Sequence, residues 1–76
     1  MSVSLEQRSS GLYALRLDEV SPTLLYLGEA NLMSPTSSPV WRIKRISTSS
    51  GVIVEWADGN VNFDNVWDDR ASLSYL

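Results

Sequence analysis

The sequence contains no cysteine and no histidine. Without cysteine the chain has no disulfide bond and no thiolate nucleophile or metal ligand. Without histidine it lacks the commonest transition-metal ligand and the usual base of a serine or cysteine nucleophile. We therefore expect no catalytic function, no metal and no bound cofactor. Basic charge is also scarce, with a formal net charge of -3, and this disfavours nucleic acid as a partner.

Long hydrophobic runs are missing as well. No apolar run approaches the roughly 18 residues that are needed to cross a bilayer, so we expect no membrane partner. The first residues, MSVSLEQR, lack the apolar stretch of a signal peptide. These features predict a protein that stays in the cytoplasm where it is made, or that is released by lysis.

The chain is short, with 76 residues, but its hydrophobic fraction of 43% is sufficient for a globular core. A domain of this size buries only about 60% of the surface of its unfolded chain. Since no disulfide can compensate, we expect stability to come from oligomerisation or from assembly onto a larger body. The sequence divides into a polar N-terminal arm, residues 1–10, and one small β domain, residues 11–76.

Within the domain, alternating or clustered apolar residues lie between turn signals, a pattern that is typical of strands. The first strand alternates Tyr13, Leu15 and Leu17 with polar neighbours. The expected strands lie at 12–17, 24–27, 40–46 and 52–57, with a fifth beginning at Val61 and Phe63 and a short sixth at 73–75.

The turn and helix signals complete this prediction. Asp58-Gly59 is a strong hairpin signal because both residues tolerate positive φ. Beyond Phe63 the apolar spacing becomes helical, which predicts one short helical turn near residues 64–70 with Asp64 as its cap. We therefore expect an all-β fold, a small antiparallel sandwich or barrel-like meander of about five or six strands.

Large apolar side chains in the second half of the sequence are the candidates for the core. The predicted core residues are Ile43, Val54, Trp56, Phe63 and Trp67. Trp41 shares a face with Ile43 and fits the core too. Tryptophan is also favoured at interface hot spots, so Trp41 stays a candidate for either role.

A small basic cluster follows Trp41. The candidate interface residues are Trp41, Arg42, Lys44, Arg45 and Tyr75. The cluster favours cross-strand ion pairs, for instance with Glu55 on the neighbouring strand. Basic residues beside an aromatic ring are also found where single-stranded nucleic acid binds, and that alternative stays open here.

Acidic and amide residues gather after the fourth strand. Asp58, Asn60, Asn62 and Asp64 partly fit a calcium loop, but its sixth position is Phe63 instead of glycine. Local turn and capping roles explain these residues more simply, and the sequence does not decide whether they bind a cation. A pair of carboxylates such as Asp64 and Asp68 is typical of glycosidases, but a chain this short has little room for their cleft.

Several segments occur in an order that carries a resemblance. They are YLGEA (26–30), VWRIKRI (40–46), EWADGN (55–60) and FDNVWDDRASLSY (63–75). Together, over about residues 25–76, they resemble a group of small, uncharacterised proteins encoded by tailed bacteriophages. The loop residues 31–35 depart from the small, glycine-containing segment expected in that group.

This resemblance implies a non-enzymatic structural protein of a bacteriophage virion. Its expected partners are other phage structural proteins and further copies of itself. Its expected location is the virion and, during assembly, the host cytoplasm. We favour a tail, fibre or baseplate component, with capsid decoration as the first alternative. Two further hypotheses are a small regulator that binds a host protein and a carbohydrate- or nucleic-acid-binding module that uses Trp41.

Overall fold

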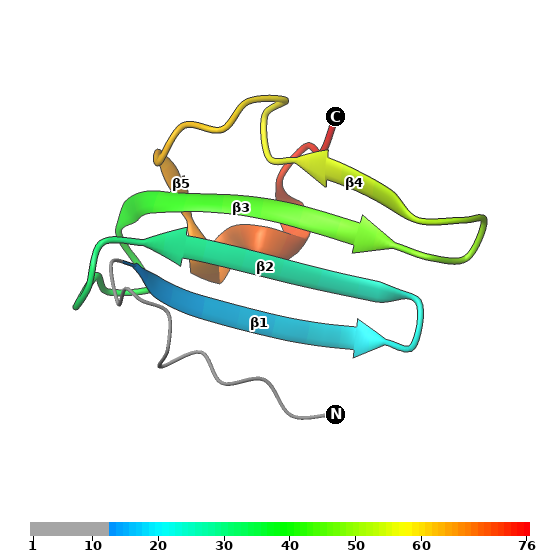
Figure 1. The fold of residues 1–76 in the computed structure, drawn as a ribbon. Helices are drawn as coiled ribbons and strands as arrows, with labels where there is room; N and C mark the ends of the chain where they lie inside the picture. Colours follow the sequence, from blue (N-terminus) through cyan, green and yellow to red (C-terminus); the bar gives the residue numbers. More distant parts are fainter. Residues whose placement is uncertain (1–12) are drawn as a thin grey trace.

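The computed structural model describes residues 13–76 (Figure 1). Its elements, in chain order, are β1 (Ala14–Ser21), β2 (Leu24–Ala30), β3 (Pro39–Ser47), β4 (Ile53–Trp56), β5 (Asn65–Val66) and the 3₁₀ helix η2 (Trp67–Ser72). The first four strands form an antiparallel meander in the order β1-β2-β3-β4, and β5 pairs with β3. The fold is all-β, as the sequence predicts, and its sheet is open instead of closed into a barrel. The predicted arm, residues 1–10, lies outside the described residues.

The strand register gives the sheet two distinct faces. Leu17 of β1 lies opposite Leu27 of β2, and Lys44 of β3 continues the row between Leu27 and Trp56 of β4. Because successive side chains of a strand point to opposite sides, these four residues share one face. Their neighbours along each strand, such as Ile43, point to the other face.

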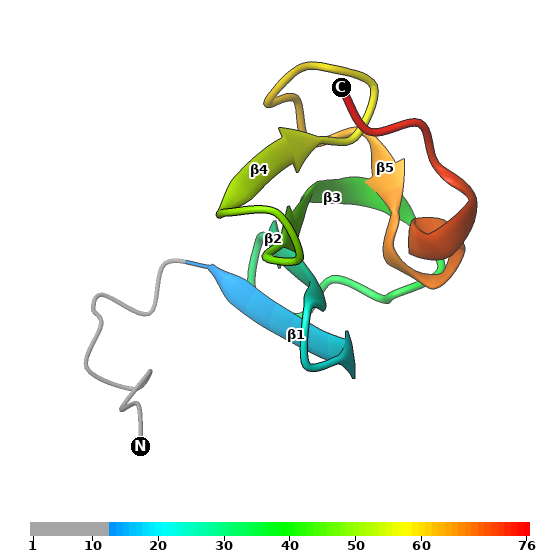
Figure 2. The ribbon, with the colours of Figure 1, turned by 90° about the vertical axis from the view of Figure 1, so that its right-hand side faces the viewer.

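The core lies on that second face, which we call the covered face. Figure 2 shows β5, η2 and the C-terminal segment on this side of the curved sheet. The buried apolar residues are Tyr26, Ala30, Trp41, Ile43, Ala57, Trp67 and Tyr75. The rings of Trp41 and Trp67 lie 6.1 Å apart. Gly28 makes this packing possible, since a Cβ atom there would lie 2.6 Å from Cε3 of Trp67.

The C-terminal segment returns to the sheet after η2. Ala57 and Tyr75 form an antiparallel bridge, and Trp56 and Leu76 exchange backbone hydrogen bonds of 3.2 and 3.1 Å. The short terminal strand that was predicted at 73–75 is therefore reduced to this bridge. The C-terminal segment thereby occupies the edge of the sheet beside the end of β4, so no other segment can pair there.

The predicted fifth strand at Val61 and Phe63 is wrong. Asp58 and Gly59 do adopt positive φ, at 60° and 71°, and form the expected turn. The chain beyond this turn cannot pair with β4, because the C-terminal segment already pairs there. It continues irregularly until residue 65 and pairs with β3 instead, as β5.

The predicted helical turn exists but begins later than expected. It spans 67–72 instead of 64–70, because Val66 is still extended and pairs with Pro39 of β3. Val66 is the residue at the N-cap, and no side chain there makes a capping hydrogen bond. The expectation that Asp64 caps this helix is therefore wrong.

Candidate interaction surface

The predicted core residues separate between the two faces of the sheet. Ile43 and Trp67 are buried on the covered face, with 1% and 5% of their surface exposed. Val54 is 49% exposed and Phe63 is 39% exposed, so their assignment to the core is wrong. Trp56 is only partly buried. The apolar residues of β4 occupy both faces, and for that reason their pattern did not indicate which one is covered.

Two predicted interface residues belong to the core instead. The Trp41 side chain is fully buried, and its Nε1 atom donates a hydrogen bond to the Pro35 carbonyl oxygen at 2.9 Å. Tyr75 is 7% exposed, and its hydroxyl donates to the Arg70 carbonyl oxygen at 2.8 Å. Burial raises the pKa of the Tyr75 hydroxyl to about 12. Neither side chain is available to a partner in this fold, which corrects both expectations.

The predicted basic cluster is divided by the sheet. Arg45 lies on the covered face, where it donates to Glu55 at 2.6 Å, so the cross-strand pair that the sequence predicted is confirmed. The hydrogen bond to Glu55 raises the pKa of the Arg45 guanidinium. Arg42 and Lys44 lie on the opposite side, which we call the open face. Arg42 donates twice to one carboxylate oxygen of Glu29, at 2.6 and 3.0 Å.

Cations of the open face stack on aromatic rings. The Arg42 guanidinium lies 4.6 Å from the ring centre of Phe63 and 5.6 Å from that of Trp56. Nζ of Lys44 lies 5.1 Å from the ring centre of Trp56. These cations occupy positions over the Trp56 ring where a base or a sugar would stack. The binding module predicted from the sequence used Trp41 instead, and the fully buried ring of Trp41 offers no face to a base or a sugar, so that prediction is wrong.

The open face also carries a continuous set of apolar side chains. Its apolar members on the four long strands are Leu15, Leu17, Leu25, Leu27, Ile46, Val54 and Trp56. The C-terminal segment covers the other face, and no strand or helix of residues 13–76 packs on this side of the sheet (Figure 2). Leu17 is 65% exposed, and most of its neighbours on this face are half-buried. Such a surface suits contact with another protein more than it suits water.

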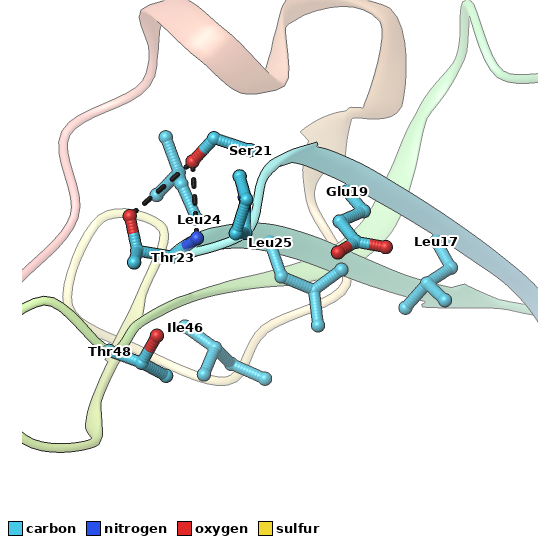
Figure 3. Close-up of a pocket in the computed structure, with 9 residues that line it drawn as sticks. Leu17, Glu19, Ser21, Thr23, Leu24, Leu25, Ile46 and Thr48 are labelled. Atoms are coloured by element: carbon cyan, nitrogen blue, oxygen red, sulfur yellow. Dashed lines mark hydrogen bonds between the residues drawn. The ribbon is translucent and has the colours of Figure 1, made fainter. Parts of the chain in front are cut away.

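One end of this face contains a shallow hollow of about 240 Å³ (Figure 3). Leu17, Leu25 and Ile46 line its apolar side, and the Glu19 carboxylate lies beside them. The turn between β1 and β2 forms its rim, where Ser21 Oγ accepts a hydrogen bond from the backbone N–H of Thr23 at 3.2 Å. The hollow is smaller than the roughly 300 Å³ at which small-molecule sites begin. It suits a single side chain of a partner.

The calcium-loop candidates form a local turn. Oδ1 of Asn60 accepts a hydrogen bond from the backbone N–H of Asn62 at 2.9 Å, and Oδ1 of Asp64 accepts one from the Asn65 side chain at 3.3 Å. Among residues 13–76, no three acidic side chains converge as a metal site would require. Asn60 therefore performs the turn-forming role that the sequence indicated, whereas Asp64 does not perform the capping role.

Sequence reasoning missed the open face because it requires the register of four strands at once. The sequence offered one signal: Leu15 and Leu17, and likewise Leu25 and Leu27, are two residues apart and therefore share a face of their strand. This spacing does not indicate what covers that face.

In the part of the chain that the structure describes, no helix is long and apolar enough to span a membrane. Comparisons with protein-family models, with curated proteins and with solved structures found no match.

Proposed function

We propose that this chain is a non-enzymatic structural protein of a bacteriophage virion that functions through contacts between subunits. The observation that carries the proposal is the apolar open face of a small, open sheet. A domain of this size gains stability when its native state binds a neighbour, because binding shifts the folding equilibrium by mass action. A virion supplies neighbours in fixed positions and in many copies.

The order of the segments between residues 25 and 76 supports the phage assignment, because that order resembles small proteins of tailed bacteriophages. Within the virion we assign the protein to the tail, as a fibre or baseplate component. Decoration of the capsid is the alternative location. Both locations require the same physical property, a surface that binds neighbouring subunits without chemistry.

Mass spectrometry of purified particles, with intensity-based copy numbers, tests this function. A few to a few dozen copies per particle would support a fibre, baseplate or neck component. Hundreds of copies would instead support capsid decoration or the tail tube. Absence from the particles would contradict the proposal and favour a regulator that binds a host protein.

A matched pair of variants connects the result to the open face. Val54→Asp places a charge on the open face and should reduce the copy number in particles. Ile53→Asp also replaces an apolar side chain of β4 by a charge, but at a residue that is 45% exposed and points to the opposite face of the sheet, and it should leave the copy number unchanged. Equal incorporation of both variants would show that the open face makes no contact in the particle.

A further inference from the structure

Strand β1 is an unpaired edge of the sheet. It forms a ladder with β2 on one side, and no other strand of residues 13–76 pairs with its second side. Its eight residues, Ala14–Ser21, make it twice as long as β4 at the opposite end of the sheet. A free edge of this length presents a row of backbone donors and acceptors that another strand can satisfy.

Several large apolar side chains in β1, and one directly before it, are exposed to solvent. Leu17 at its centre is 65% exposed, and Val20 and Tyr13 are 55% and 44% exposed. Opposite charges flank Leu17, since Arg16 precedes it and Asp18 follows it. Asp18 uses one carboxylate oxygen to accept a hydrogen bond from Arg70 at 2.9 Å. Arg16 makes no ion pair with any acidic side chain of residues 13–76.

We propose that β1 pairs antiparallel with β1 of a second copy, about a two-fold axis that passes through Leu17. In this arrangement each residue that follows the axis lies opposite the residue that precedes it in the other copy. Arg16 of each copy therefore faces Asp18 of the other, and the two ion pairs are equivalent. Opposite charges in directly facing positions stabilise an antiparallel pair.

Charge and side-chain direction select this register over its neighbours. An axis through Arg16 would place two arginines face to face, and an axis through Asp18 would place two aspartates face to face. An axis between two residues would place side chains that point to opposite faces directly across from each other, which an antiparallel pair does not allow. The axis through Leu17 avoids these conflicts and pairs the regular part of β1, which ends at the irregularity between Glu19 and Ser21.

The paired molecule has one continuous sheet of the two four-stranded meanders. Both open faces lie on the same side of it, and the two Leu17 side chains meet at the centre. The apolar surface available to a partner is thereby doubled. The pairing extends the proposed function and rests on it, because a virion would supply the high local concentration of copies that favours pairing.

A cysteine placed at the axis tests the register directly. Leu17→Cys introduces the only thiol of the chain. Residues directly opposite in an antiparallel pair have Cα atoms about 4.5–5.5 Å apart, within the range that a disulfide spans. Under mild oxidation we expect this variant to form a covalent dimer of twice the 8.5 kDa protomer mass.

Val20→Cys is the matched control on the same strand. Val20 has similar exposure but lies opposite Ala14 of the second copy in the proposed register. The two Val20 positions would be separated by about 20 Å along the strands, at roughly 3.3 Å per residue. This variant should remain monomeric under the same oxidation. Equal dimer yields from both variants would show random collision and would overturn the proposal.

Charge variants provide a second test in the full-length, cysteine-free chain. Arg16→Asp places one aspartate opposite each Asp18, and Asp18→Arg places one arginine opposite each Arg16. Each variant alone should show the monomer mass by light scattering at concentrations where the wild type is a dimer. An equal mixture of the two should form a heterodimer, because every facing pair is again of opposite charge. Failure of the mixture to associate would contradict the register.

The outcomes separate this pairing from other occupants of the edge and from the proposed function. A wild type that is monomeric, with the β1 amides that point away from β2 protected from hydrogen exchange, would show that residues 1–12 of the same chain cover the edge. A monomer in which those amides exchange freely would show a free edge, and either result overturns the pairing. Absence from virions together with Leu17-specific crosslinking would remove the proposed function and leave the pairing intact.

Discussion

Tyr75 illustrates how burial controls the chemistry of a single side chain. Its hydroxyl is enclosed with Tyr26, whose ring centre lies 5.6 Å away, and it donates to the Arg70 carbonyl oxygen. Removal from water disfavours the phenolate and raises the pKa from 10 to about 12. The guanidinium groups of Arg45 and Arg70 favour the phenolate, but their effect is smaller than that of burial.

This raised pKa predicts alkaline destabilisation. Between pH 10 and about 12 the folded chain retains a proton that the unfolded chain releases. The contribution of Tyr75 to the free energy of unfolding therefore has its full value below pH 10. It is lost as the pH rises through this window, which lowers the free energy of unfolding by about 2–3 kcal/mol in total. Urea unfolding at a series of pH values measures the decline. Tyr75→Phe removes the titrating group, and its stability should decline less over the same interval.

The packing around Gly28 leaves no room for a side chain at that position. A Cβ atom would lie 2.6 and 2.8 Å from two carbons of the Trp67 ring and 3.3 Å from one of Trp41. Gly28→Ala should therefore destabilise the fold by about 1–3 kcal/mol through overpacking. Trp67→Leu provides the control, because it removes the clash. The double variant should lose less stability than the sum of the two single losses; an additive result would argue against this contact.

At the scale of an element, the turn at Asp58 and Gly59 also requires a glycine at one position. Gly59 has φ of 71°, and a Cβ atom there would lie 3.3 Å from the Leu76 side chain. Gly59→Val should lower the free energy of unfolding by about 1–2 kcal/mol, because a β-branched residue resists positive φ. Asp58→Asn is the control, since asparagine tolerates the φ of 60° at that position. Thermal melting that is unchanged in Gly59→Val would argue against the turn conformation.

The elements also show what the sequence can and cannot predict. Local signals sufficed to locate β2, β3 and the turn at 58–59, because alternation and turn chemistry act over a few residues. They failed at β5, where the competitor for the β4 edge is the C-terminal segment, some 20 residues further along. They also failed for the ion pair of Asp18 with Arg70, whose partners are 52 residues apart.

The candidate surface was harder to predict than the elements. The sequence indicated that Trp41, Arg42 and Lys44 lie near one another on one strand. It placed Trp41 and Tyr75 among the interface residues, whereas both are buried. Composition alone cannot say which face of a sheet a short C-terminal segment will cover, because apolar residues lie on both faces.

At the scale of the whole molecule, the two faces of the sheet differ in how much their side chains contribute to the free energy of unfolding. Trp41 lies on the covered face with none of its surface exposed, while Trp56 lies on the open face among cations. Truncation of Trp41 leaves a cavity and removes one of the two hydrogen bonds that the Pro35 carbonyl oxygen accepts, the other coming from the backbone N–H of Ser38. Truncation of Trp56 removes ring contacts with Arg42 and Lys44 and a partly buried apolar surface on the open face.

We therefore predict a large difference between two chemically identical substitutions. Trp41→Ala should cost about 3–5 kcal/mol and leave so small a domain mostly unfolded. Trp56→Ala should cost about 1–2 kcal/mol, roughly the value of two exposed cation–π contacts, and the domain should still fold. Circular dichroism with urea titration distinguishes the two. If Trp56→Ala unfolds the isolated chain as fully as Trp41→Ala, then a second layer already covers the open face in solution, and the surface that we assign to assembly is not free.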